Sequence, residues 1–358
     1  MNNSSIRFPA EWEKHRATWL CWPHNEEDWP GKLLSAQWAF AEMVRHLSSS
    51  ETVEIICDSE NILHSAQEQI SLHLGSLPKA PKDRLAHCRF HLLNTNRSWV
   101  RDSGPTAVWQ KNELLWRWWN FNAWAKYDDY PLDQQIPGLV SQISGIALSR
   151  VTYPSSNKQL TLEGGAIEAN GQGVIMVTEE CLLSQVQERN PGLERKDYEE
   201  LFASILGCPK TIWLEKGIVG DDTHGHIDDV ARFTSAETIA LAVEPDPSDE
   251  NYHISRENLA RLKGEKTLSG GNYNIIELPM PEPVYHGEER LPASYANFYI
   301  GNKVVLVPVF NDPNDRIALD LLARAFPDRL VTGIYSRDLI LGRGSIHCLT
   351  QQEPAGQP

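Results

Sequence analysis

The order in which strands and helices are expected along this chain repeats, and the repetition constrains the fold more than any single motif does. Apolar and β-branched runs surround amphipathic segments in the order strand, strand, helix, strand. Five such units can be read, and the first contains only strand, helix, strand. Units that repeat their order of elements point to a propeller-like or array fold. We therefore expect an α/β fold of five ββαβ units, formed by residues 1–358 as one domain without a linker.

The segments of these units are assigned from periodicity and turn residues. Phe40, Met43, Val44 and Leu47 are spaced as on one face of a helix. The residues after Gln351 look like a polar tail. The other expected helices are 62–74, 134–144, 179–187, 196–206, 255–262 and 315–325, and the expected strands are 18–22, 53–57, 89–93, 106–109, 114–119, 151–153, 160–163, 174–177, 211–214, 230–233, 238–243, 273–278, 297–300, 303–309 and 330–334.

Composition and charge narrow the function. The chain of 358 residues carries a net charge of −15, which argues against nucleic acid or an anionic membrane as partner and is compatible with a cationic small ligand. Residues 1–5 lack the features of a signal peptide, and no apolar run is long enough to span a bilayer. The six cysteines contain no C-x-x-C pair, so neither a disulfide framework nor a thiolate zinc site is expected. We expect a cytoplasmic protein, with its oligomeric state left open, a homo-oligomer included.

A glycine-rich stretch near the C-terminus presents one of these cysteines. Within residues 341–350, Gly342 and Gly344 precede a short apolar segment that contains Cys348. Glycines at such a place usually allow unusual backbone dihedral angles or a close approach to another group. The thiol is then either a small packed core residue, as most unpaired cysteines are, or a nucleophile.

Three further polar clusters occur at nearly even spacing before Cys348, each beside the first strand of a unit. They contain Asp102, Glu163, and His226 with Asp228. If the units surround a pseudo-symmetry axis, equivalent strand ends converge on it, and the four positions meet at the centre. Each cluster also has a simpler interpretation. The segment around Asp102 can be only a turn, and the one after Glu163 only a bulge or a hairpin.

The stretch 220–229 is harder to explain as a solvated loop. It holds four acids, two histidines and two glycines in ten residues. It precedes the strand expected at 230–233, where alternation would place the side chains of His226 and Asp228 on the same face. We also assign Asp222 of this stretch to the substrate-binding residues.

Together the clusters supply a thiol, an imidazole, a glutamate and two aspartates. A free thiol is only a few per cent thiolate at neutral pH, so Cys348 needs a base or a cationic neighbour. His226 can act on the thiol, and Glu163 can orient and charge the imidazole. Asp102 and Asp228 would repel each other unless a cation lies between them. A planar guanidinium, with its paired N–H donors, suits that place.

Four motifs in this order resemble the agmatine deiminase family, which also contains bacterial peptidylarginine deiminases. They are W-V-R-D-S-G-P-T at 99–106, E-G-G at 163–165, G-H-I-D-D-V-A-R-F at 225–233 and I-H-C-L-T-Q-Q at 346–352. Segments 9–13, 22–23 and 121–124 match as well, so the resemblance covers the whole chain. It implies the pentein fold, a fivefold α/β propeller of ββαβ units, in agreement with the units read above.

The resemblance also implies a mechanism that uses no metal and no cofactor. Asp102 and Asp228 would hold the guanidinium while the Cys348 thiolate attacks its central carbon. His226, held by Glu163, would protonate the departing ammonia and then activate water to release the ureido product. The expected substrate is agmatine, which would give N-carbamoylputrescine, with peptidylarginine or another guanidino compound as the alternative.

Four residues bear on the pocket around the guanidinium site. Trp22 and Trp99 would wall it and favour a cation through their π faces, or else simply pack in the core. Arg343 stands where the family more often has a third glycine, and His224 where agmatine-specific members tend to carry an acid. Both departures leave the guanidinium chemistry unchanged and concern the substrate's tail.

Three other functions are weighed against this interpretation. A metallohydrolase would use His224, His226 and Asp228 as ligands on alternate residues, with Cys348 as a fourth. It leaves Asp102 without a task, and Glu163 as well. An inactive pentein would bind a guanidino ligand or a protein partner without turnover, which the full set of site residues argues against. An amidinotransferase would use the same chemistry with an amine in place of water.

Overall fold

The strands of the protein form five sheets of three or four strands and one separate hairpin, within residues 6–75, 84–153 and 156–356, which the computed structural model describes. Residues 1–5, on which the signal-peptide prediction rests, lie outside the described residues. Each of the five larger sheets contains both antiparallel and parallel pairs of strands. The mixture matches the predicted ββαβ units.

The repeated unit is clearest in the fourth sheet. β11 (Ala231–Ser235) pairs antiparallel with β12 (Thr238–Val243), and after α7 (Asn251–Gly264) the strand β13 (Asn274–Pro279) returns parallel to β12. The central strand β12 is buried from Ile239 onward. A strand with partners on both sides and both faces covered is expected to be apolar, which explains its sequence T-I-A-L-A-V.

Three other sheets repeat this order, with a helix crossing between the second strand and the third. The second sheet contains β5 (Thr106–Gln110), β6 (Glu113–Trp118), α4 (Ile136–Ser144) and β7 (Ala147–Arg150), with β1 (Ile6–Arg7) on its edge; the third contains β8 (Glu168–Ala169), β9 (Val174–Thr178), α5 (Glu179–Leu183), α6 (Arg195–Leu201) and β10 (Lys210–Leu214); the fifth contains β16 (Tyr299–Ile300), β17 (Val304–Val309), α8 (Asn314–Ala325) and β18 (Leu330–Tyr335).

The first sheet is completed by the far end of the chain. β19 (Thr350–Pro354) pairs antiparallel with β2 (His15–Cys21) and supplies the first strand that the first unit lacked in sequence order. Residues 352–354 of the expected polar tail are therefore part of a strand. Glu353 of β19 is fully buried and accepts a hydrogen bond from Trp19 Nε1 at 3.0 Å. The other elements of this sheet are α1 (Leu33–Leu47), β3 (Thr52–Cys57), α2 (Glu60–Gly75) and β4 (Cys88–Leu92).

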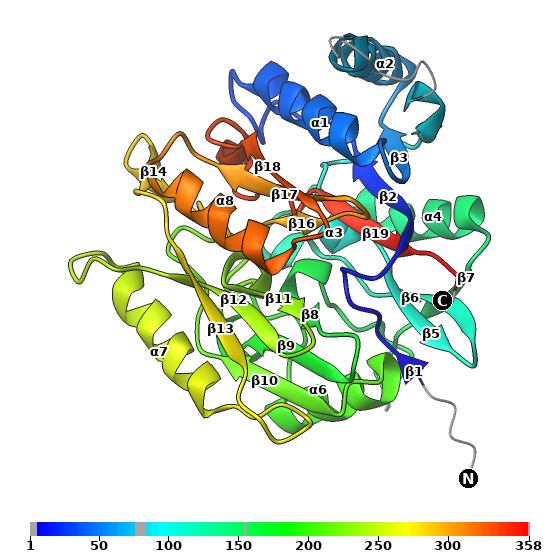
Figure 1. The fold of residues 1–358 in the computed structure, drawn as a ribbon. Helices are drawn as coiled ribbons and strands as arrows, with labels where there is room; N and C mark the ends of the chain where they lie inside the picture. The colour runs from blue at the N-terminus through cyan, green and yellow to red at the C-terminus, as the bar shows by residue number, and fades with distance from the viewer. Residues whose placement is uncertain (1–5, 76–83, 154–155, 357–358) are drawn as a thin grey trace.

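The polar clusters lie on short turns and not within the long elements. In Figure 1 the helices α1, α4, α7 and α8 lie at the periphery, whereas β8, β11 and β16 lie towards the middle of the molecule, near α3. The strand ends therefore bring the connecting turns together in the interior. These short elements are α3 (Val100–Ser103) and the 3₁₀ turns η4 (Gly164–Ala166), η6 (Ile227–Asp229) and η7 (Leu339–Gly342).

Several predicted elements have other boundaries in the structure. The strand expected at 151–153 lies earlier, at β7, and the one expected at 160–163 forms only an isolated bridge between Asn120 and Thr161. The helix expected at 179–187 ends at Leu183, because Ser184 is extended and its hydroxyl accepts the N–H of Val186. Such local side-chain hydrogen bonds compete with the helix.

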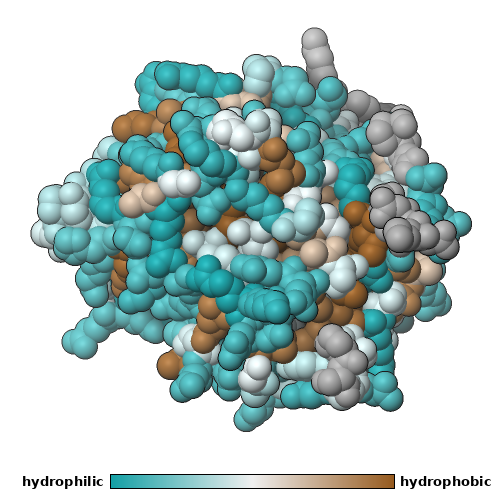
Figure 2. Space-filling view, turned by 90° about the horizontal axis from the view of Figure 1, so that it is seen from below, coloured by the Kyte–Doolittle hydropathy of each residue, from teal (hydrophilic) through white to brown (hydrophobic). Residues whose placement is uncertain are grey.

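Apolar side chains gather between the helices and the sheets. Beneath α1, for example, Phe40, Val44 and Leu47 pack with Ile55 of β3 and are fully buried. The face of the molecule in Figure 2 is covered mainly by hydrophilic side chains, with hydrophobic ones in small groups between them. Along the described parts of the chain, every helix is too short or too polar to cross a membrane.

Candidate active site

Cys348 lies at a pocket of about 260 Å³ that is also lined by Trp99, Asp102, Trp124 and Asp222. The thiol sits on the turn just before β19 and is buried. Asn297 donates from Nδ2 to its sulfur at 3.1 Å, and the thiol points to Asp228 Oδ2 at 3.6 Å. The segments just before the strands β16 and β11 thus deliver the residues that surround the thiol.

The glycine before this cysteine is required by close packing. A Cβ atom on Gly344 would lie 2.7 Å from the ring of Trp99 and 3.3 Å from Cys348 Sγ. Arg343, by contrast, has a φ of +68°, a left-handed conformation that favours glycine. The position where the family more often has glycine therefore keeps the glycine-like backbone while it carries an arginine.

Asp102 is held from two directions. Its Oδ1 accepts the N–H of Gly165 at 2.9 Å, and its Oδ2 accepts Nε1 of Trp124 at 2.9 Å. Burial raises the pKa of Asp102 to about 6, against the opposing effect of His226. Asp228 contributes to the increase. The site therefore holds more negative charge than its own cations balance.

Asp228 lies on η6, whose helical turn makes the alternation argument for His226 and Asp228 wrong, although both side chains are buried in the site. Its Oδ2 accepts a hydrogen bond from Nδ1 of His347 at 2.7 Å. Its Oδ1 has no hydrogen-bond partner among the described residues. Burial raises the pKa of Asp228, but the bond and charge of His347 outweigh burial and hold that pKa below its usual value.

His226 is fully buried between two carboxylates. Its Nδ1 lies 3.7 Å from Asp102 Oδ2 and its Nε2 lies 3.9 Å from Glu163 Oε2. Neither ring nitrogen has a hydrogen-bond partner among the described residues. Burial lowers the pKa of His226, but Asp102, Cys181 and Glu163 together raise it well above its usual value. These neighbours therefore favour the protonated form of the imidazole, which can donate a proton.

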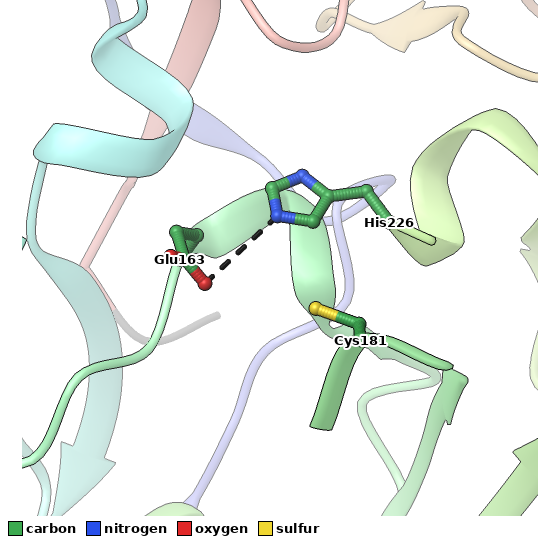
Figure 3. A group of neighbouring side chains, drawn as sticks. All are labelled: Glu163, Cys181 and His226. Carbon is green, nitrogen blue, oxygen red and sulfur yellow. Dashed lines mark ion pairs between the residues drawn. The ribbon is translucent and has the colours of Figure 1, made fainter. Parts of the chain in front are cut away.

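Glu163 is fixed by an arginine that sequence reasoning missed. Nε of Arg189 donates to Glu163 Oε1 at 3.0 Å, and both side chains are fully buried. Burial raises the pKa of Glu163, but Arg189 and His226 outweigh it and hold that pKa at about 2. Figure 3 shows Glu163 and Cys181 close to the ring of His226. Cys181, at the start of α5, was not predicted to belong to the site either.

Gly165 allows these groups to approach one another. A Cβ atom at this position would lie 2.5 Å from His226 Nδ1, 2.9 Å from Asp102 Oδ1 and 3.1 Å from Asp228 Oδ2. No other residue type fits there without displacing one of the three. The E-G-G motif is thus explained by side chains that come from two other short elements, α3 and η6.

Behind Asp228 lies a buried chain of charged groups that sequence reasoning also missed. Nε2 of His347 is 2.8 Å from Glu11 Oε2, and Nη2 of Arg232 is 2.8 Å from Glu11 Oε1. Nε of Arg232 continues the chain to Glu168 Oε2 at 2.9 Å. His347 and Arg232 stand inside the recognised motifs, so their positions beside Cys348 and Asp228 were a usable signal.

The remaining predicted residues lie in different places. Trp99 lines the pocket, whereas Trp22 is fully buried and packs edge-on against Phe40, as in the core-packing alternative. Asp222 lies at the pocket, where its carboxylate binds Lys126 and Tyr127. Most of the predicted set is therefore gathered at one place.

Comparison with known proteins decides the family. The family model of the Porphyromonas-type peptidyl-arginine deiminase matches residues 7–354. The chain belongs to this deiminase family. A relative from Vibrio parahaemolyticus, provisionally named an agmatine deiminase, is 35% identical over 97% of this chain and 96% of its own.

Solved structures of the deiminase family agree with this assignment. The agmatine deiminase of C. jejuni with substrate bound is 29% identical, with a TM-score of 0.85 over 99% of this chain and 97% of its own. The agmatine deiminase of Enterococcus faecalis is 28% identical, with a TM-score of 0.86 over 98% and 96%. An amidinotransferase from Microseira wollei, 12% identical with a TM-score of 0.53, shares the fold only. The fold of the chain is thus the pentein fold.

The alternative metal site of the deiminase chain is not assembled as predicted. His224 has a φ of +66° and its Nε2 bonds Ser184 Oγ at 2.9 Å, beside a separate shallow pocket. It therefore does not join His226 and Asp228. Among the described residues, the groups with suitable ligand spacing are Glu163 with Cys181 and His226, and Asp228 with Asp229 and Cys348.

Proposed function

We propose that the protein hydrolyses a guanidinium group to a ureido group and ammonia, with agmatine as the substrate and N-carbamoylputrescine as the product. One observation carries the proposal: the buried carboxylates of Asp102 and Asp228 lie around a single thiol, Cys348, next to the imidazole of His226. The names of the relatives, agmatine deiminase, support the choice of substrate.

The substrate cation compensates the charge of the site. Asp102 and Asp228 repel each other, and Asp228 Oδ1 lacks a partner among the described residues, so a flat cation with several N–H donors satisfies both carboxylates. The pocket of about 260 Å³ is of a size for a small molecule. Trp99 offers an aromatic wall to the cation.

The thiol is neutral until the cation arrives. Burial raises the pKa of Cys348 well above its usual value, and the acids Asp228, Asp229 and Asp102 raise it further. A guanidinium beside the sulfur supplies the positive charge that stabilises the thiolate. The thiol releases its proton to solvent as the cation binds, and the thiolate then attacks the central guanidinium carbon to give a neutral tetrahedral adduct.

Two proton transfers by His226 complete the reaction. The imidazolium gives its proton to one amino group of the adduct, the C–N bond breaks, and ammonia leaves behind an S-linked amidinium. The neutral imidazole then takes a proton from water, and the hydroxide adds to the same carbon. Collapse of this second adduct breaks the C–S bond and forms the ureido carbonyl. The hydroxyl proton passes to the leaving sulfur, which restores the Cys348 thiol. Glu163 positions the imidazole and stabilises its charged form.

Ammonia release from agmatine, free arginine and a peptidylarginine tests the proposal directly. We expect ammonia and a ureido product in equal amounts, with agmatine the best substrate. Replacing Cys348 by alanine removes the nucleophile, so turnover should be abolished while the melting temperature stays near that of the wild type. Ammonia release that persists in the variant would contradict the assignment of the nucleophile.

A second variant tests whether Asp102 binds the guanidinium group. Asp102→Asn keeps the shape of the side chain and removes its charge, so we expect a higher KM, a lower kcat and a loss of about tenfold or more in kcat/KM. An unchanged kcat/KM would mean that Asp102 is only a structural residue on α3.

A further inference from the structure

A further buried carboxylate on the pocket wall has one oxygen without a partner among the described residues. Asp28 lines the same pocket as Cys348 and its side chain is only 2% exposed. Its Oδ1 accepts a hydrogen bond from Nη1 of Arg97, but its Oδ2 has no partner among the described residues. Its ion pair with Arg97 places it on the part of the pocket wall that Arg97 forms.

Trp99 connects the two parts of the cavity. Its ring lies next to Gly344, against the turn that carries Cys348, and it also neighbours Asp28, whose pKa it lowers. Burial outweighs this effect and that of Arg97, and raises the pKa of Asp28 to about 6. The local cations therefore do not fully compensate the Asp28 carboxylate.

The cations around the pocket mouth are already occupied. Arg97 is paired on its other side with Asp129, Arg343 makes two bonds to Glu289, and Lys126 is paired with Asp222. With Glu27 also on the pocket wall, the mouth holds more acids than bases. The acids are Glu27, Asp28, Asp129, Asp222 and Glu289, and the bases are Arg97, Lys126 and Arg343.

Asp222 is less available to a ligand than Asp28. Its Oδ1 is taken by Lys126 and its Oδ2 accepts the hydroxyl of Tyr127 at 2.5 Å. Arg343 lies 3.8 Å from the same carboxylate. The acid that sequence analysis assigned to substrate binding is thus engaged on both oxygens, whereas Asp28 is engaged on one.

We propose that Asp28 binds a second positive charge at the far end of the substrate, so that the enzyme selects guanidino compounds that end in an ammonium group. This inference rests on the proposed function and adds to it the residue that binds the terminal ammonium group of the substrate. A tail that ends in a carboxylate finds no unpaired cation in this part of the described pocket and meets the charge of Asp28 instead.

The test compares two substrates that differ in the terminal ammonium group. Agmatine carries this group on its four-carbon chain, and butylguanidine has a hydrogen atom in its place. In the wild type we expect kcat/KM for agmatine to exceed that for butylguanidine by about tenfold or more, as for a hydrogen bond between charged groups. In Asp28→Asn, which retains an acceptor for Arg97, the preference should fall to near unity through a higher KM for agmatine.

Asp129→Asn is the matched control. It removes the other carboxylate partner of Arg97, is 38% exposed at its side chain and does not line the pocket, so the substrate preference should be unchanged. An equal loss for both substrates in Asp28→Asn, or no loss for either, would overturn the proposal.

If Asp28→Asn does not fold, the comparison of the two substrates in the wild type still tests the proposal. Equal kcat/KM for the two substrates would overturn the role of Asp28 and leave the proposed hydrolysis intact. No ammonia from either compound would instead refute the hydrolysis itself. The two failures are therefore distinguishable.

Discussion

At the scale of single residues, the unusual feature is a thiol surrounded by acids. Cys348 is buried beside Asp102, Asp228 and Asp229, and the charges of these three acids raise the pKa of its thiol. Most activated cysteines are instead paired with a cation of the protein. In this protein the substrate brings the cation, which protects the thiol from reacting with other electrophiles while the pocket is empty.

Cys181 gives a residue-scale prediction, because it is one of the groups that raise the pKa of His226. Cys181→Ala should lower that pKa, so the imidazole loses its proton at a lower pH. Since the protonated form is needed to release ammonia, the alkaline limb of the kcat profile should move to lower pH. Cys208→Ala, which removes another buried thiol outside the site, should leave the profile in place. An unmoved limb in Cys181→Ala would contradict this.

At the scale of elements, the short turn η4 gives the sharpest prediction. Gly165→Ala would force His226, Asp102 or Asp228 aside, because the added Cβ has no free space. We expect a loss of about a hundredfold in kcat, as for a displacement of about 1 Å in an active site. The measurement is single-turnover ammonia release together with a thermal melt.

Gly138 supplies the control for that substitution. It lies in α4 and an added Cβ would meet nothing within 4 Å. Gly138→Ala should leave activity unchanged and raise stability by about 0.5–1 kcal/mol, because alanine is favoured in a helix. Normal activity in Gly165→Ala would mean that the turn can move away without cost.

The long elements could be predicted from the sequence because their periodicity is set by burial. β12 and α1 are examples, with apolar residues wherever a neighbouring layer covers them. The turn η6 could not, because acids, glycine and histidine carry no periodicity and the 3₁₀ conformation depends on partners such as Asp221, which accepts the N–H of His226 at 2.9 Å. β19 was missed because its polar residues are satisfied by Trp19 and other distant side chains.

The active-site residues could likewise be predicted only where the sequence around them carries a recognisable pattern. Residues within motifs, such as Cys348 and Asp102, could be found because their types are rare in those contexts. Arg189 and Asn297 could not, because an isolated arginine or asparagine gives no signal until the fold places it beside Glu163 or the thiol. Trp22 shows the opposite error: it lies in a matching segment and was assigned to the pocket, but its ring packs against Phe40 in the hydrophobic core.

At the scale of the whole molecule, the net charge of −15 should affect how the substrate arrives. A negative surface attracts a cation with two charges more than one with a single charge, and salt screens this attraction. We expect kcat/KM for agmatine to fall several-fold, roughly, between about 10 mM and about 500 mM NaCl, with a smaller fall for butylguanidine. Equal salt dependence for the two substrates would argue against long-range steering.

The pairing of β19 with β2 has a consequence for how the protein matures. Thr350 and Leu20 come together from nearly opposite ends of the described chain, and Cys348 reaches its place through this pairing. Contacts between such distant positions form late, because the intervening polypeptide must first give up much of its freedom. On refolding, the helical circular dichroism signal should therefore recover before enzymatic activity does. A nascent chain in which four of the five sheets have formed would still lack activity.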